Sequence, residues 1–237
     1  MAYKALYRKY RPETFDNVVG QQHIIKTLQN AILNDKVAHA YIFSGPRGTG
    51  KTTTAKLLAK ALNCTNEEKP CNGCDNCKAI NEGSHPDIIE IDAASNNGVD
   101  EVRELIEKVK YAPILGKYKV YIIDEVHMMT PGAFNALLKT LEEPPAHVVF
   151  ILATTDVHKV IPTVLSRCQR FDFSKIGFED IKERVINILN LENIEFENNV
   201  PNLVAELADG GMRDALSILD QIVSYAGNSI TLQHVYD

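Results

Sequence analysis

The feature that most constrains the fold is a glycine-rich segment, Gly45–Thr52, with the sequence GPRGTGKT. An apolar run at 40–43 precedes it, and a run with helical spacing at 53–62 follows. In a strand–turn–helix context such a segment binds phosphate, because backbone N–H groups and the positive end of the helix converge on one place. The alternative is an ordinary glycine turn capping a helix. Lys51 and both flanking elements favour a nucleoside triphosphate site made by Gly45, Pro46, Arg47, Gly48, Thr49, Gly50, Lys51, Thr52 and Thr53.

A second chemical feature lies about 70 residues further on, where the apolar run 119–123 ends in Asp124 and Glu125. Two carboxylates at this position would lie at the carboxyl edge of a parallel sheet, where α/β folds bind ligands. Asp124 and the hydroxyl of Thr52 suit a Mg²⁺ ion, and Glu125 suits polarising a water for attack on the γ-phosphate. The alternative is a helix N-cap. The distance from the phosphate loop favours the catalytic interpretation.

The N-terminal segment is both aromatic and basic, and two interpretations of it are equally supported. Tyr10, Arg11 and Pro12, together with Val18 and Val19, offer flat or apolar surfaces that suit an adenine base. The other interpretation is a basic arm whose tyrosines pack on the core.

Four of the five cysteines fall close together, at Cys64, Cys71, Cys74 and Cys77, while Cys168 stands alone. Four thiolates at short spacing favour a structural zinc ion with no open coordination position. An iron–sulfur cluster is the rival interpretation, because related spacings bind clusters.

Hydrophobic residues make up 45% of the 237 residues and charged residues 24%, which is ordinary for a globular protein with a sizeable core. The formal charge of −6 argues against a uniformly basic nucleic-acid binder. No secretory signal or membrane-length apolar run is present, so we expect a cytoplasmic protein without membrane contact.

The order of expected elements predicts two domains. Strands at 40–43, 87–91, 119–123, 148–153 and 170–173 alternate with helices that include 99–110 and 131–142. All of these strands but the last are read as buried. Helices alone then follow at about 179–191, 199–208 and 212–226. This change favours a nucleotide-binding α/β domain at 1–176 and a helical domain at 177–237. The exposed Arg103, Lys108 and Lys110 are read as a solvated face, with a nucleic-acid contact as the alternative.

With these motifs together, the chain resembles the AAA+ ATPases, and among them the γ/τ clamp-loader subunits of bacterial DNA polymerase III. The resemblance covers essentially the whole sequence and rests on YRKYRP, VVGQ, GPRGTGKT, the cysteine insertion at about 64–77, IIDEVHM, LATTD, LSRC and GGMRDALS. It implies a RecA-like parallel sheet with flanking helices, a zinc-binding insertion and a small all-helical lid. It further implies that Thr155 is a sensor residue (Thr154 is not excluded), that Arg167 is an arginine finger for a neighbouring subunit, and that Arg213 is a second sensor on the lid.

The resemblance implies an ATP-hydrolysing motor subunit that uses ATP, Mg²⁺ and Zn²⁺ to load a sliding clamp on primed DNA during replication. Its partners would be the other loader subunits, the clamp and DNA, with polymerase chemistry left to other subunits. Members of the family carry a third, helical collar domain, so the chain is expected to be part of a longer protein and this piece monomeric. Rival interpretations are another AAA+ ATPase of replication or repair, a P-loop kinase and a non-hydrolysing scaffold. On residues alone, Arg167 would pair with a carboxylate such as Asp172.

Overall fold

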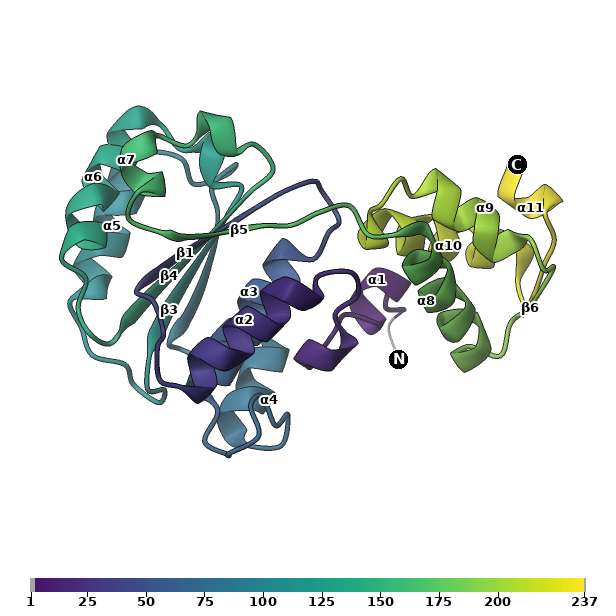
Figure 1. The fold of residues 1–237 in the computed structure, drawn as a ribbon, viewed down its shortest axis with the longest axis horizontal. Helices are drawn as coiled ribbons and strands as arrows, with labels where there is room; N and C mark the ends of the chain where they lie inside the picture. Colours follow the sequence, from purple (N-terminus) through teal and green to yellow (C-terminus); the bar gives the residue numbers. More distant parts are fainter. Residues whose placement is uncertain (1–2, 237) are drawn as a thin grey trace.

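A computed structural model describes residues 3–236 of the chain and shows two lobes. One lobe is a parallel sheet between layers of helices, and the other is a bundle of helices (Figure 1). A single extended segment after β5 leads from the sheet into the bundle, while the N-terminal helix α1 lies between the two lobes. Among the described residues, no helix is both long and apolar enough to cross a membrane.

The sheet has five parallel strands in the order β2-β3-β4-β1-β5. Their bounds are β1 Ala40–Ser44, β2 Ile88–Asp92, β3 Lys119–Asp124, β4 Val148–Thr154 and β5 Gln169–Asp172. Residues of β1, β3 and β4 are almost entirely buried, as the continuous apolar runs predict for strands covered on both faces. Parallel pairing brings the carboxyl ends of all five strands to one edge.

The expectation of a buried strand at 87–91 is wrong in one respect. β2 is an edge strand whose residues are only partly covered, because it pairs with β3 alone. The buried residue in this region is Asp87, which lies just before the strand.

Alternate residues of β1 face opposite layers of helices, which gives the lobe two cores. Tyr41 and Phe43 pack with α2 (Gln22–Leu33) and α3 (Lys51–Asn63). Ala40 and Ile42 face α5 (Val99–Val109) and α6 (Pro131–Glu142). Thr130 caps α6 by accepting a hydrogen bond from the Ala133 N–H at 3.2 Å, and Pro131 occupies its first position, where a missing N–H costs nothing.

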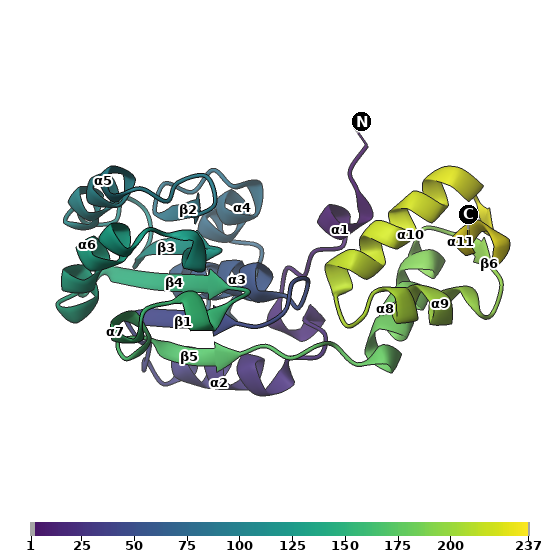
Figure 2. The same ribbon diagram turned by 90° about the horizontal axis from the view of Figure 1, so that it is seen from above.

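The second lobe contains α8 (Phe178–Leu191), α9 (Val200–Leu207), α10 (Met212–Ala226) and α11 (Gln233–Tyr236), as Figure 2 shows. These helices share a hydrophobic core centred on Ile181, Val185, Leu219 and Val204. The sequence predicted only helices in this lobe. The structure also has two short strands, β6 (Glu195–Phe196) and β7 (Ser229–Ile230), which pair in parallel beside the helices. The helix α11 ends at Tyr236, and Asp237 lies outside the described residues.

Several short elements have no strong sequence signal. They are the helices α1 (Leu6–Lys9), α4 (Asp75–Glu82) and α7 (Pro162–Leu165), and the 3₁₀ turns η1 (Phe15–Asn17), η2 (Val126–Met128) and η3 (Val157–Lys159). α1 packs on α10 of the helical lobe, and α4 packs on α3. Both short helices therefore join parts of the chain that the sheet does not connect.

Candidate nucleotide and metal sites

A cavity of about 800 Å³ lies where the carboxyl edge of the sheet, the N-terminal segment and the helical lobe meet. It is lined by most of the residues expected to hold a nucleotide, namely Tyr10, Arg11, Pro12, Val18, Val19, Arg47, Gly48, Thr49, Gly50, Lys51, Thr52, Thr53 and Arg213. Asp124, Glu125 and Thr155 also line it. Of the expected residues, Gly45, Pro46 and Arg167 do not. The fold thus brings nearly all of the expected site together.

The phosphate loop has the conformation that its glycines predict. Gly48 and Gly50 have φ angles of +76° and +99°, which side-chain-bearing residues rarely adopt. Lys51 begins α3 and is 6% exposed, and its Nζ donates to the carbonyl oxygens of Gly45 at 2.8 Å and Pro46 at 2.7 Å. Burial lowers the pKa of the Lys51 ammonium, and the nearby carboxylates of Glu125 and Asp124 oppose that shift.

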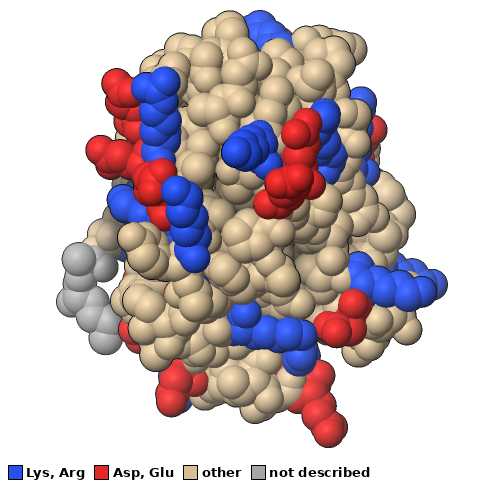
Figure 3. Space-filling view, turned by 90° about the vertical axis from the view of Figure 1, so that its left-hand side faces the viewer, with Lys and Arg blue, Asp and Glu red and all other residues tan. Residues whose placement is uncertain are grey.

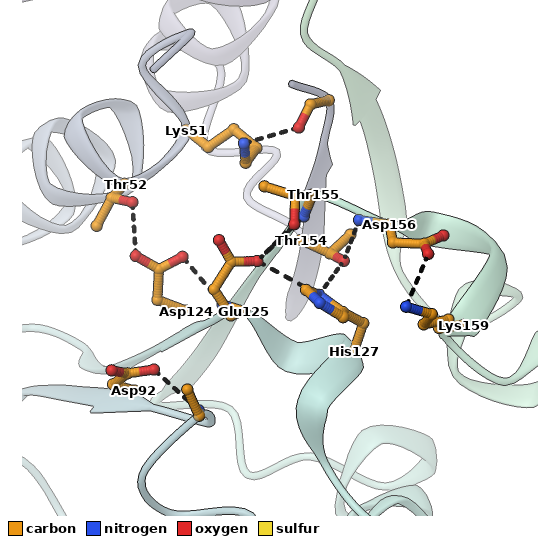
Figure 4. A network of polar contacts seen from close by, with 12 residues as sticks. Lys51, Thr52, Asp92, Asp124, Glu125, His127, Thr154, Thr155, Asp156 and Lys159 are labelled. Carbon is orange, nitrogen blue, oxygen red and sulfur yellow. Dashed lines mark hydrogen bonds and ion pairs between the residues drawn. The ribbon is translucent and has the colours of Figure 1, made fainter. Parts of the chain in front are cut away.

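Thr52 and Asp124 lie together as a hard-cation site requires. The Thr52 Oγ1 donates to Asp124 Oδ2 at 2.7 Å, across 72 residues of sequence (Figure 4). A hydroxyl and a carboxylate oxygen this close, beside a phosphate loop, fit the oxygen ligands that Mg²⁺ prefers.

Glu125 is held at the end of β3 in a left-handed conformation, with φ of +48°. Its Oε2 accepts hydrogen bonds from the Thr155 Oγ1 at 2.9 Å and the Thr155 N–H at 3.2 Å. His127 Nδ1 lies 3.3 Å from the same oxygen and 3.0 Å from Thr154 Oγ1 (Figure 4). Thr154 is fully buried, whereas Thr155 is exposed and lines the cavity, so of the two only Thr155 is accessible to a ligand bound there.

The N-terminal segment packs its tyrosines as one of the two interpretations expected, but with a different partner, and its place beside the cavity leaves the adenine interpretation as a prediction. Its tyrosines pack on the helical lobe and not on the sheet lobe: Tyr7 and Tyr10 join the core of α8 and α10. The Tyr10 hydroxyl donates to Glu192 at 2.5 Å. Residues 10–12 nevertheless line the cavity, where Arg11 Nε donates to Thr53 Oγ1 at 3.1 Å.

The helical lobe supplies Arg213 and Arg184 to the cavity. The Arg213 guanidinium lies 5.3 Å from the centre of the Tyr7 ring, within cation–π range. The N–H of Met212, at the start of α10, donates to the carbonyl of Gly48 in the phosphate loop at 3.0 Å. The lobe therefore touches the loop directly.

Arg167 lies away from the cavity of its own chain, after α7. Its Nη2 pairs with Glu142 Oε1 at 2.5 Å, and Nη1 donates to the Thr163 carbonyl. The expected partner on residues alone, Asp172, was wrong, because Asp172 is engaged by Arg170 and Ser44.

Seven basic side chains line the cavity, and within the described residues none of them forms an ion pair. They are Lys4, Arg8, Arg11, Arg47, Lys51, Arg184 and Arg213. Only three carboxylates, Asp92, Asp124 and Glu125, share the lining. The cavity therefore has a positive excess that a polyanion would neutralise.

The four clustered cysteines meet beside the far end of α3. Cys64 follows that helix, Cys74 precedes α4 and Cys77 lies within it. The four sulfur atoms all lie within 4.8 Å of one another. Sulfurs that bind zinc at ~2.3 Å in a tetrahedron are roughly 3.8 Å apart, so the donor set could bind a zinc ion.

The basic residues in and directly after α5 are exposed to solvent. Arg103 pairs with Asp100 at 3.0 Å and Lys110 with Glu107 at 2.9 Å, all on the exposed face of the helix. Figure 3 shows the side of the molecule that carries α5 and α6, where acidic and basic side chains are interspersed. This face offers no continuous basic patch.

Sequence reasoning missed several residues of the site, and three of them carry groups that could take part in its chemistry. His127 contacts Glu125, Arg184 lines the cavity from α8, and Asp92 lies beside Asp124 in the β2–β3 register. Asp92 could have been found, because it follows an apolar strand as Asp124 does. Arg184 carries no such signal, since a basic residue on an amphipathic helix is usually solvated.

A phosphate loop after β1 of a parallel sheet, an acidic pair at the end of β3, which β4 separates from β1, and a helical lid that touches the loop define an AAA+ ATPase. A family model described as "DNA polymerase III, delta subunit" matches residues 20–177, and one described as "DNA polymerase III clamp loader subunit, ATPase lid domain" matches residues 180–228. The chain belongs to the clamp-loader subunits of DNA polymerase III.

Among curated relatives, DNA polymerase III subunit tau of Bacillus subtilis is 58% identical over 235 residues, which is 98% of this chain and 42% of that protein. Subunit tau of Escherichia coli is 49% identical over 237 residues, 99% of this chain and 37% of that protein. The chain thus spans about two fifths of the length of these relatives. The Thermotoga maritima RuvB Holliday junction branch migration motor shares the fold, with a TM-score of 0.67 at 19% identity over 96% of this chain and 71% of that one.

Proposed function

We propose that this chain is the ATP-hydrolysing part of a clamp-loader subunit, which couples ATP binding and hydrolysis to the loading of a sliding clamp on primed DNA during replication. The observation that carries the proposal is the unpaired positive charge around the phosphate loop, opposite the Asp124–Glu125 pair. A triphosphate neutralises that charge, and the acidic pair supplies the groups for its hydrolysis.

The roles of the site residues follow from their positions. Lys51 exchanges its carbonyl partners for the outer phosphates, and Thr52 and Asp124 hold a Mg²⁺ ion that offsets phosphate charge. Glu125 orients the attacking water once Thr155 turns from the carboxylate towards the γ-phosphate. The adenine lies among Tyr10, Pro12, Val18 and Val19. Arg213 contacts the bound nucleotide from the lid.

The partners proposed for the whole protein are other loader subunits, the sliding clamp and primed DNA, in a cytoplasmic homo- or hetero-oligomer. Arg167 supports this assembly, because it lies outside its own cavity and can reach a neighbour's nucleotide by releasing Glu142. The domain boundary proposed at 176/177 falls on the segment that leads from β5 into α8. A zinc ion held by Cys64, Cys71, Cys74 and Cys77 has a structural role and stabilises the fold of this segment.

Lys51→Ala tests nucleotide binding, and Lys56→Ala is a matched control on the same helix, since Lys56 forms a surface ion pair with Glu90. Without the Lys51 charge, the dissociation constant for ATP should rise at least about tenfold, roughly 1.4 kcal/mol, in a calorimetric titration. The Lys56→Ala chain should bind as wild type. Equal ATP affinity of the Lys51→Ala and wild-type chains would contradict the proposed site.

A further inference from the structure

A buried ammonium group lies between the nucleotide cavity and the four-cysteine cluster. Lys60, on α3, is 2% exposed, and no carboxylate of the described residues forms an ion pair with it. Its Nζ donates to the Glu13 carbonyl at 2.7 Å, to Asn72 Oδ1 at 2.6 Å and to Asn81 Oδ1 at 2.7 Å. A buried cation is costly unless hydrogen-bonded, so all three donors of this ammonium are used to join separate segments.

Two of the three acceptors belong to the cysteine module. Asn72 lies between Cys71 and Cys74, in the loop that brings these thiols together, and its φ of +55° is one that asparagine tolerates. Asn81 lies on α4, one helical turn after Cys77. Lys60 therefore contacts both the loop between Cys71 and Cys74 and the helix α4 that carries Cys77. Its position depends on how the cysteines are held.

The third acceptor, the carbonyl of Glu13, lies next to the nucleotide cavity, which Asn81 also lines. Glu13 directly follows residues 10–12, which line that cavity, and Arg11 is itself bonded to Thr53 on α3. Lys60 and Thr53 thus fix the cavity-lining segment at two points on one helix. Because Thr53, Lys60 and Cys64 are spaced seven and four residues apart, they lie on the same face of α3, along roughly 16 Å of helix.

We propose that Lys60 is a positioning residue that couples metal binding by the cysteine module to nucleotide binding. This inference rests on the proposed ATP-binding function. Four thiolates around a divalent zinc ion carry a net charge of about −2, which the neighbouring Lys60 ammonium offsets. An ordered, metal-bound module holds Asn72 and Asn81 in place, which fixes Lys60 and through Glu13 keeps residues 10–12 against the cavity.

The first test compares ATP binding of the chain with zinc and after zinc removal, in excess Mg²⁺. In the wild type, zinc removal should raise the dissociation constant for ATP about fivefold or more, and should speed amide hydrogen exchange over residues 10–14. Lys60→Met keeps the length of the side chain and removes the ammonium, so it should show the weaker ATP binding even with zinc. It should also bind zinc about tenfold more weakly, the size of effect seen when groups supporting metal ligands are lost. Lys56→Met, at a half-buried position of α3 whose ammonium pairs with Glu90, is the control and should change neither constant.

Two milder variants test the same link if Lys60→Met does not fold. Asn72→Gly keeps the left-handed backbone and Asn81→Ala keeps the helix, and each removes one acceptor while all four cysteines remain. Each should reduce the effect of zinc on ATP affinity, and the double variant should abolish it. An ATP affinity of the wild type that does not change with zinc would overturn the coupling, as would a double variant with undiminished zinc dependence. Failure of the zinc-loaded wild type to bind ATP at all would instead contradict the proposed function.

Discussion

At the scale of single residues, Glu125, the carboxylate proposed to orient water, is held in place by its neighbours. Both the N–H and the hydroxyl of Thr155 bond to one oxygen of Glu125, and His127 lies close to the same oxygen. These contacts fix the orientation of the carboxylate at the end of β3. The φ of +48° at Glu125, costly for a side-chain-bearing residue, indicates that the surrounding structure holds it there.

Replacing Glu125 separates binding from chemistry. Glu125→Gln keeps the size of the side chain and its bond to the Thr155 hydroxyl, but removes the charge that orients water. We expect ATP affinity within about twofold of wild type and turnover in the full assembly at least about a hundredfold lower. Titration and phosphate release measure the two quantities. Turnover near the wild-type rate would assign the water-orienting role to another residue.

At the scale of elements, the long periodic segments were predictable and the short ones were not. β1, β3, β4, α6 and the lid helices follow continuous or periodic apolar runs, so their sequence carries its own signal. α4 and α7 span at most eight residues, and α4 begins inside the cysteine cluster, where metal-ligand spacing hides the helix. The exposed position of β2 depends on its single neighbour in the sheet, which no local pattern encodes.

The cysteine module can be tested as an element. Elemental analysis should find about one zinc ion per chain, and Cys74→Ser should reduce that content together with the melting temperature, because metal binding contributes to folding free energy. Cys168→Ser is the control, since that thiol lies outside the cluster. A metal-free chain of full stability, or the visible absorbance of an iron–sulfur cluster, would exclude the zinc assignment.

The loop before β3 is held in place by the side chain of Asp87. This buried carboxylate accepts hydrogen bonds from the N–H groups of Ile114 at 2.7 Å, Leu115 at 2.7 Å and Gly116 at 2.8 Å. Burial favours a higher pKa for Asp87, but these three donors outweigh it, so the pKa lies below its usual value. The stabilisation is therefore present above the unfolded-state pKa of ~3.9 and is lost as pH falls through the lower folded-state pKa.

Asp87→Asn should consequently lower the free energy of unfolding by about 2 kcal/mol at pH 7, the size expected for hydrogen bonds to a charged group. The difference from wild type should shrink as the pH falls below about 4, where the wild-type carboxyl also becomes neutral. Urea unfolding at several pH values measures it. A difference that stays constant down to pH 3 would show that the charge of Asp87 does not stabilise the loop.

At the scale of the whole molecule, the nucleotide site is an interface between parts far apart in the sequence. The α/β sheet and phosphate loop could be predicted in detail because their motifs are local. The contacts of the N-terminal segment with α8 and α10 could not, since they depend on how two lobes meet: Lys9 and Tyr10 bond to Glu192, and Tyr3 bonds to Asp220. The roles of Arg167 and Arg213 were expected from the family resemblance only, because local pattern alone would have left them as ordinary surface arginines.

The proposed role of Arg167 is tested by mixing subunits in the assembly. Arg167→Ala should leave ATP binding in its own chain unchanged, because the side chain lies outside that cavity. It should lower hydrolysis in the neighbouring site, and loss of an arginine finger in GTPases costs ~10³–10⁵ in rate. Arg170→Ala is the control, since Arg170 forms an exposed pair with Asp172. A defect confined to the mutant's own site would show that Arg167 acts within its own chain.

The bond between Tyr3 and Asp220 has a consequence for how the chain is made. The two residues are 217 positions apart, so Tyr3 can meet its partner only after the segment that carries Asp220 has been synthesised. At ~5–20 residues per second, that delay is roughly 11–43 s. During it the sheet can form around the phosphate loop while the tyrosines and arginines of the N-terminal segment remain without their lid. The nucleotide cavity is thus completed only after α8 and α10 have been translated and have joined the N-terminal segment.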